Sequence, residues 1–214
     1  MTRILFICHG NICRSPMAEM IFRELVRRAH REKEFIIDSA GTSYEESGNP
    51  VYPKARQALR ELGYPCGAHA ARRIEPEEYD SWDLLICMEK YNVRNLLRAL
   101  GGDPEGKIHL LMEYAGSNAD VDDPYYYGNF TGVCRQIEEG CKALFQNLTV
   151  MFKIFCKRTK SDEQRISGAR GNKAADARER SHRYSGLGLA GSRGNAKMDG
   201  RWGDKEVSDF HRRR

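Results

Sequence analysis

Residues 4–16 read Ile4-Leu5-Phe6-Ile7-Cys8-His9-Gly10-Asn11-Ile12-Cys13-Arg14-Ser15-Pro16. The apolar run at 4–7 predicts a buried strand, and the helical spacing of apolar residues after Pro16 predicts a helix over residues 16–31. A strand joined to a helix by a short loop directs several backbone N–H groups at one point, where the positive end of the helix dipole adds to their field. The loop is therefore expected to bind an oxyanion.

Four residues of this loop indicate which chemistry it supports. Gly10 supplies the positive φ that such a loop needs, and the planar guanidinium of Arg14 matches two phosphate oxygens. Cys8 lies at the floor of the loop, where the positive field favours the reactive thiolate. Ser15 is a good helix N-cap, and its hydroxyl can donate to the Cys8 sulfur. A thiolate below a phosphate indicates attack on phosphorus through a phosphocysteine; the alternative is a buried structural cysteine at a chance spacing.

The chain up to about residue 156 alternates strands with helices. The strands are expected at 3–7, 35–38, 83–88 and 107–112, and the helices at 16–31, 51–62, 75–79, 89–100 and 130–155. This alternation predicts an α/β fold with a four-stranded, parallel, doubly wound sheet and helices on both faces. Ligands of such sheets bind at the carboxyl ends of the strands, where the Cys8 loop is placed.

Residues 8–19, which read Cys8-His9-Gly10-Asn11-Ile12-Cys13-Arg14-Ser15-Pro16-Met17-Ala18-Glu19, resemble the signature of the low-molecular-weight protein tyrosine phosphatases. The acid loop of that family is matched by Asp122-Asp123-Pro124-Tyr125-Tyr126. The likeness extends from about Arg3 to about Leu148. It implies a flavodoxin-like strand order and hydrolysis of phosphotyrosine in proteins, or of small aryl phosphates, through a phosphocysteine.

The resemblance also assigns roles to individual residues. Cys8 is the nucleophile, Arg14 binds the phosphate, and Asp123 protonates the leaving group and then activates water. Asn11, Ser39 and His69 match family residues that hold the loop by hydrogen bonds. The residues assigned to substrate binding are His9, Gly10, Asn11, Ile12, Cys13, Ser15, Tyr125 and Tyr126. Asn11 in addition suits a left-handed backbone conformation.

The acid loop allows a simpler interpretation, because Asp-Pro sequences favour turns and both aspartates could serve only that purpose. Beside the Cys8 loop, the catalytic interpretation of Asp123 is preferred, and Asp122 is the second candidate.

Cys13 has two possible roles. It can form a disulfide with Cys8 that protects the nucleophile from overoxidation, or it is a small buried apolar residue. A zinc site is not expected, because no Cys or His pair with ligand spacing lies near these two cysteines. No metal or other cofactor is expected either, since Arg14 and the loop N–H groups neutralise the phosphate.

One region departs from the family pattern. Many members carry a tryptophan after the Ser-Ala-Gly segment, whereas this chain has Ser43-Tyr44-Glu45-Glu46. Tyr44 is therefore expected to form that wall of the pocket. Glu45 and Glu46 are expected to repel acidic substrates, so the peptide preference stays open.

Charge divides the chain into two parts. Residues 157–214 contain sixteen Lys/Arg and eight Asp/Glu, a net charge of +8, whereas residues 1–156 carry a net charge of −3. This predicts a phosphatase domain over 1–156 and a basic, disordered tail over 157–214 that contacts polyanions weakly. Seven irregularly spaced cysteines argue against a disulfide framework, and no apolar run is long enough to span a membrane. A cytoplasmic location is expected.

Three other functions stay open. Relatives that act on phosphoarginine tend to carry threonine at the position of Ile12, so Ile12 favours phosphotyrosine. An arsenate reductase of the same fold needs two further cysteines close together, and Cys66 and Cys87 are not obviously paired. The non-enzymatic alternative is a phosphate-binding module with a polyanion-binding tail, which the presence of every catalytic residue type disfavours.

Overall fold

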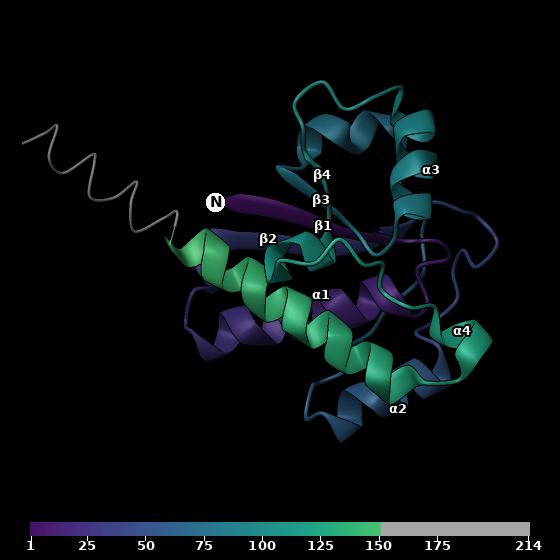
Figure 1. The fold of residues 1–214 in the computed structure, drawn as a ribbon, viewed down its shortest axis with the longest axis vertical. Coiled ribbons are helices and arrows are strands. Elements are labelled where there is room, and N and C mark those ends of the chain that lie inside the picture. Colours follow the sequence, from purple (N-terminus) through teal and green to yellow (C-terminus); the bar gives the residue numbers. More distant parts are fainter. Residues whose placement is uncertain (151–214) are drawn as a thin grey trace, which may run out of the picture. The chain divides into compact units, whose positions relative to one another are not determined.

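A parallel four-stranded sheet forms the centre of the molecule (Figure 1). The structure is a computed structural model and describes residues 1–150. The strands are β1 (Thr2–Cys8), β2 (Phe35–Gly41), β3 (Leu84–Cys87) and β4 (Ile108–Leu110), in the order β2-β1-β3-β4. All four predicted strands and their parallel arrangement are confirmed. The predicted domain boundary at residue 156 and the predicted disordered tail lie outside the described residues.

Two strand ends differ from the sequence prediction by more than one residue. β2 continues three residues beyond residue 38, because it stays paired with β1 until Cys8 lies opposite Gly41. β4 ends at Leu110 instead of residue 112, since the carboxylate of Glu113 accepts the backbone N–H of Leu110 and the chain turns into the 3-10 helix η3 (Leu111–Ala115). Local hydropathy does not encode either effect.

The helices follow the predicted order with shifted ends. They are α1 (Arg14–Arg28), α2 (Pro53–Glu61), α3 (Lys90–Leu100), the short α4 (Pro124–Tyr127) and a helix that occupies residues 130–150, with the 3-10 helices η1 (Glu32–Glu34) and η2 (Pro76–Ser81) between them. α1 begins at Arg14, so Ser15 lies inside the helix and the prediction that it is the N-cap is wrong. α1 also ends before residue 31, because His30 adopts a positive φ of 54°.

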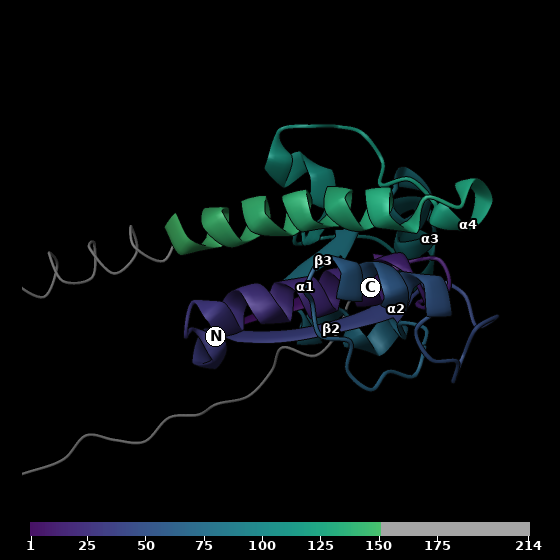
Figure 2. The same ribbon diagram turned by 90° about the horizontal axis from the view of Figure 1, so that it is seen from below.

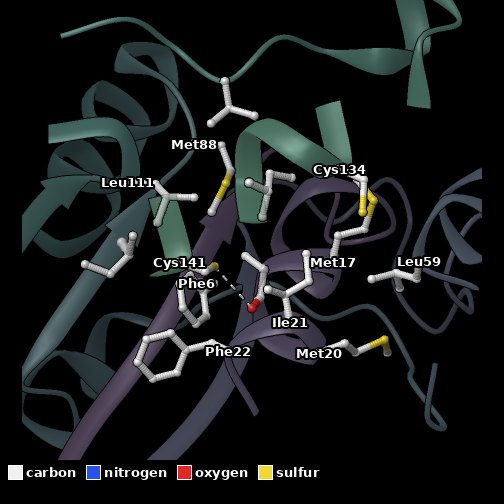
Figure 3. Packing of buried hydrophobic residues seen from close by; sticks show 14 of the residues in the cluster. Phe6, Met17, Met20, Ile21, Phe22, Leu59, Met88, Leu111, Cys134 and Cys141 are labelled. Carbon is white, nitrogen blue, oxygen red and sulfur yellow. Dashed lines mark hydrogen bonds between the residues drawn. The ribbon is translucent and has the colours of Figure 1, made fainter. Parts of the chain in front are cut away.

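The two faces of the sheet carry separate apolar clusters. On one face, Ile4, Phe6 and Cys8 of β1 pack against α1, α2 and the 130–150 helix. Figure 2 shows the 130–150 helix running beside α1, and Figure 3 shows the interior of this cluster, where Phe6 and Phe22 pack close together. The other face, with Leu5 and Ile7, packs against α3 and η2. Helices therefore cover both faces, as predicted.

The carboxyl ends of β1, β2 and β3 meet at one edge of the sheet. Cys8, Gly41 and Cys87 are the last residues of these strands. The end of β2 lies very close to the loop that follows β1: a Cβ atom on Gly41 would lie only 2.6 Å from the carbonyl oxygen of His9. The backbone N–H of Thr42 donates to that oxygen at 2.9 Å and so ties β2 to the loop that follows β1.

Among residues 1–150, the structure contains no helix that combines the length and the apolar character of a membrane span.

Candidate active site

The loop between β1 and α1 surrounds the sulfur of Cys8. The Cys8 side chain is buried, and its Sγ accepts the backbone N–H of Asn11 at 3.3 Å. The Ser15 hydroxyl lies 3.0 Å from the same sulfur and 3.3 Å from the Ala40 carbonyl, so its hydrogen has two acceptors within reach. The predicted contact between Ser15 and Cys8 is present. These donors are arranged to stabilise negative charge on the sulfur.

The Asn11 side chain connects the loop to the segments around it by hydrogen bonds. It is fully buried and adopts a left-handed backbone conformation with φ of 57°, as expected for an asparagine at this position. Its Nδ2 donates to Ser15 Oγ at 2.9 Å and to Ser39 Oγ at 3.0 Å, while its Oδ1 accepts the backbone N–H of Arg72 at 3.0 Å. One side chain therefore joins α1, β2 and the segment before η2. The positive φ predicted for Gly10 belongs to Asn11 instead.

Gly10 has a different reason to be glycine. A Cβ atom at this position would lie 3.0 Å from Cγ of Glu46, which reaches over the loop. The constraint is the close approach of a neighbouring segment, and a pattern within the loop itself does not reveal it.

The other two residues predicted to hold the loop, His69 and Ser39, also contact it. Nε2 of His69 lies 2.7 Å from the Asn11 carbonyl oxygen, and because a carbonyl can only accept, His69 is the donor. Ser39 accepts from Asn11 and donates to Oε2 of Glu19 at 2.6 Å. Glu19 is thus an additional member of this network; it belongs to α1 and comes from the same motif as the loop.

Arg14 lies beneath the loop with almost no exposed surface. Its Nη2 is 2.7 Å from Oδ2 of Asp123 and 2.9 Å from Oε1 of Glu89, and its Nη1 donates to the Val121 carbonyl at 3.3 Å. Burial disfavours the charged guanidinium, but the charges of Cys8, Glu89 and Asp123 outweigh it and raise the pKa of Arg14. The guanidinium therefore stays cationic and is held in a fixed orientation.

Glu89 was not singled out by the sequence analysis. It follows β3 directly, as the N-cap residue of α3. A signal for it was present, because a polar residue at the carboxyl end of a neighbouring parallel strand lies at the same edge of the sheet as Cys8.

Asp123 combines both interpretations of the acid loop. Its Oδ1 caps α4 by accepting the backbone N–H of Tyr125 at 3.0 Å, which is the turn-forming role, and its Oδ2 contacts Arg14. Asp122 points elsewhere: its side chain is exposed, and its backbone N–H donates to Gln136. Of the two carboxylates, Asp123 is the one beside the loop.

A pocket of about 270 Å³ opens above Cys8. Most of the predicted site residues line it. The side chains of Asn11 and Ser15 do not, because they are fully buried and form hydrogen bonds within the loop. The lining residues are Cys8, His9, Gly10, Ile12, Cys13, Arg14, Glu45, Glu46, Asp123, Tyr125 and Tyr126.

The rim of the pocket is aromatic on one side and acidic on the other. Tyr125 and Tyr126 are largely exposed, and their rings meet edge to face with centroids 6.0 Å apart. Tyr44 does not line the pocket, because its hydroxyl donates to Glu75 and its ring packs under the Arg73 guanidinium; the prediction that it forms a wall is wrong.

Glu45 and Glu46 line the pocket, and each already has a partner. Glu45 Oε2 lies 3.2 Å from Nε2 of His9, and Glu46 Oε2 accepts from Asn49 Nδ2 at 2.7 Å. Both glutamates lie at the entrance, as predicted, and each carboxylate is oriented by one of these contacts.

Cys13 is a buried thiol at the edge of the pocket. Burial raises its pKa to about 12, with a further contribution from the charge of Cys8. The six cysteines among residues 1–150 are all free thiols. Within this same range, no group of three or more His, Cys, Asp or Glu side chains is arranged to hold a metal ion.

Comparisons with known proteins identify the family of this chain. The family model for the low molecular weight phosphotyrosine protein phosphatase matches residues 3–152. The low molecular weight protein-tyrosine-phosphatase YfkJ of Bacillus subtilis is 38% identical over 150 residues, which cover 69% of this chain and 96% of that protein. The human low molecular weight phosphotyrosine protein phosphatase is 36% identical over 148 residues, covering 67% and 93% respectively.

Solved structures give the same result. The crystal structure of YfkJ superimposes with a TM-score of 0.68 at 37% identity and covers 71% of this chain and 96% of that one. A structure described as the YwlE arginine phosphatase, a mutant with a phosphorylated active-site serine, superimposes with a TM-score of 0.62 at 28% identity, covering 69% and 96%. The chain belongs to the low molecular weight phosphotyrosine protein phosphatase family.

Proposed function

We propose that this protein hydrolyses phosphotyrosine in proteins through a phosphocysteine on Cys8. The observation that carries the proposal is that Cys8, Arg14 and Asp123 line one pocket, with Arg14 Nη2 only 2.7 Å from Asp123 Oδ2. Nucleophile, phosphate-binding cation and acid therefore lie within reach of a single phosphate group.

The first step transfers the phosphoryl group to the enzyme. The thiolate of Cys8 attacks phosphorus, a S–P bond forms, and the P–O bond to the phenol breaks. Arg14 and the loop N–H groups bind the oxygens on which charge is concentrated. The phosphate takes the place of Asp123 on Arg14, and the released carboxylate, which now lies beside a phosphate instead of a guanidinium, takes up a proton from solvent. It then donates this proton to the departing phenolate oxygen.

The second step regenerates the thiol. The carboxylate of Asp123 takes a proton from a water molecule, and the water oxygen attacks phosphorus. The S–P bond breaks, so that inorganic phosphate leaves and Cys8 returns as a thiolate. The Ser15 hydroxyl, 3.0 Å from Sγ, stabilises the thiolate as a leaving group.

Phosphotyrosine is preferred to phosphoarginine as the substrate. Ile12 lines the pocket at the position where phosphoarginine-specific relatives tend to carry threonine, and the exposed rings of Tyr125 and Tyr126 suit an aromatic substrate. The arginine phosphatase among the structural neighbours keeps phosphoarginine as the alternative.

Arsenate reduction is disfavoured by the positions of the two candidate relay cysteines. Cys66 packs on the face of the sheet that contains Cys8, whereas Cys87 is buried on the opposite face. A disulfide relay requires sulfurs that meet, and these two are separated by the sheet.

A reducing compartment such as the cytoplasm fits the proposed chemistry, because the nucleophile must remain a free thiol. The partners are then phosphotyrosine-containing proteins. Weak contacts between polyanions and residues 157–214 stay a prediction.

Initial rates on peptides that differ only in the phosphorylated residue test the proposal. Phosphotyrosine peptides should be turned over faster than phosphoserine and phosphoarginine peptides, each by at least about tenfold, because the pocket offers aromatic surface to a phenol ring. Arsenate with a thiol reductant should give no turnover. A higher rate on phosphoarginine than on phosphotyrosine would move the assignment to the alternative substrate.

A further inference from the structure

A second cavity, of about 540 Å³, adjoins the catalytic pocket. The two cavities share Ile12 and Glu46, and the second one continues along residues 49–53 to the outer side of α2. The backbone N–H of Tyr52 donates to the Ile12 carbonyl at 2.9 Å. This bond fixes the second cavity relative to the Cys8 loop, so a group bound there lies at a defined distance from the reacting phosphorus.

Two guanidinium groups line this second cavity. Arg56 and Arg60 lie one turn apart on α2, and both are exposed. Within residues 1–150, neither side chain forms an ion pair or a side-chain hydrogen bond, whereas arginines such as Arg27 and Arg72 pair with carboxylates. The acid in the cavity, Glu46, already accepts from Asn49 at 2.7 Å. The cavity therefore contains two guanidinium groups and one carboxylate, which forms no ion pair with either of them, so its net charge is positive.

The opposite side of the catalytic pocket has the reverse charge. A third cavity, of about 530 Å³, shares His9, Arg14, Asp123 and Tyr126 with the catalytic pocket. Its carboxylates are Glu89, Asp120, Asp122 and Asp123, and its guanidinium, from Arg14, is already held by two of them. A negatively charged group of a substrate is thus attracted on the α2 side and repelled on the other.

We propose that the cavity beside α2 is a specificity subsite that binds a carboxylate side chain of the substrate, next in sequence to the phosphotyrosine. This inference rests on the proposed function, since it assumes a phosphotyrosine peptide in the catalytic pocket. Arg56 and Arg60 hold the carboxylate, and the flanking apolar wall at residues 50–53 packs against the aliphatic part of a glutamate. Glu45 and Glu46 then repel acidic groups only at the entrance of the catalytic pocket.

The test compares kcat/KM for phosphotyrosine peptides that carry glutamate, alanine or lysine on either flank. Glutamate on one flank should raise kcat/KM about fivefold over alanine, because solvent-exposed ion pairs contribute modestly. Glutamate on the other flank should lower it, and both effects should weaken as ionic strength rises to about 0.15 M.

Variants test whether the two arginines of α2 cause the preference for glutamate. In the double variant Arg56→Gln/Arg60→Gln, the glutamate-to-alanine ratio on the favoured flank should fall to about one, and Arg60→Glu should turn the preference toward lysine. The single variants Arg56→Gln and Arg60→Gln should each lower the ratio, and Arg98→Gln is their matched control: it removes one positive charge from an exposed site on α3, on the other face of the sheet, and the ratio should stay as in the wild type.

Three outcomes overturn the subsite. They are equal rates on all flanks in the wild type, a glutamate preference of the same size on both flanks, and a preference that survives Arg56→Gln/Arg60→Gln. Failure of the proposed function looks different, because the wild type would then turn over none of the phosphotyrosine peptides.

Discussion

The Cys8 loop and the acid segment (residues 120–127) face the same pocket but are held in very different ways. In the loop, Asn11 and Ser15 are fully buried and joined to β2 by side-chain hydrogen bonds. In the acid segment, Asp122 and the three tyrosines that follow Pro124 are exposed. That segment is tied to the sheet at a few points, among them the backbone N–H of Val121, which donates to the Met88 carbonyl at 2.7 Å.

This difference matches the two tasks of the site. Phosphate binding profits from donors that are fixed before the substrate arrives, because no reorganisation is then needed as charge develops. The acid must first contact a leaving oxygen and then a water, so a less enclosed position suits it. Arg14 joins the two regions, since it lies under the loop and contacts Asp123. The predictions below probe each region, from the largest expected effect to the smallest.

Replacing the nucleophile should have the largest effect. Cys8→Ser should lower kcat by roughly 10⁵-fold or more, because a serine hydroxyl is a far weaker nucleophile at neutral pH. Phosphate and vanadate should still bind, as measured by calorimetry, since Arg14 and the loop N–H groups are unchanged. Turnover within tenfold of the wild type would exclude the phosphocysteine.

Replacing the acid should have the next largest effect. Asp123→Asn should slow turnover of substrates with poor leaving groups by about 10²–10⁴-fold, and of good leaving groups much less, because only the former need the proton. The alkaline limb of the pH–rate profile should disappear, since that limb reports loss of the proton from the acid.

Asp122→Asn is the matched control for this substitution. It removes the same charge one residue earlier, from an exposed carboxylate outside the catalytic pocket. If Asp122→Asn reproduces the leaving-group dependence and Asp123→Asn does not, the acid is assigned to the wrong residue.

Replacing Asn11 should destabilise the fold and weaken phosphate binding. Asn11→Ala should lower the free energy of unfolding by about 2–4 kcal/mol, because it removes buried hydrogen bonds and leaves an alanine at positive φ. Urea unfolding measures this loss.

His30→Ala isolates the backbone contribution. His30 has a similar φ of 54° but is exposed, so its substitution should cost about 1 kcal/mol. If both variants lose the same stability, the side-chain network of Asn11 contributes nothing.

The sequence predicted the fold and the loop well, for a physical reason. The central strands β1 and β3 are largely buried on both faces and therefore read as continuous apolar runs, and the strand–loop–helix arrangement around Cys8 is a local pattern. The same holds for Asn11, whose left-handed conformation follows from its residue type and its place in the loop.

What escaped prediction depends on contacts between distant segments. Glu89 acquires its role only because β3 lies beside β1, and Tyr44 is drawn away from the pocket by Glu75 and Arg73. Such partners lie too far apart in sequence for local patterns to reveal them. The first turn of α1 is a different case: Ser15 is a good N-cap by residue type, yet α1 begins one residue earlier and the Ser15 hydroxyl contacts Cys8 and Asn11 of the same loop.

Oxidation should distinguish the two cysteines of the loop. Mild peroxide should inactivate the wild type reversibly through a Cys8–Cys13 disulfide, and in Cys13→Ser less activity should return with thiol, because Cys8 then proceeds to sulfinic acid. Burial raises the pKa of Cys13 to about 12, so at pH 8 iodoacetate should label Cys8 and spare Cys13. Mass spectrometry of the labelled peptides measures the labelling, and the activity recovered with thiol measures the protection. Equal recovery in the wild type and in Cys13→Ser would show that Cys13 does not protect Cys8.

The smallest effect on catalysis is expected from removing residues 160–214. The residues that line the catalytic pocket all lie between 8 and 126, so turnover of a small aryl phosphate should stay within about twofold of the full chain. Binding to polyanions should change instead, because the removed residues 160–214 carry a net charge of +6 and the remaining residues 1–159 a net charge of −1. The full chain should bind nucleic acid weakly and lose that binding as salt rises, while the shortened chain should not bind at all. If the shortened chain unfolds or loses turnover of the small substrate, residues beyond 160 belong to the catalytic domain, and the predicted boundary at 156 is wrong.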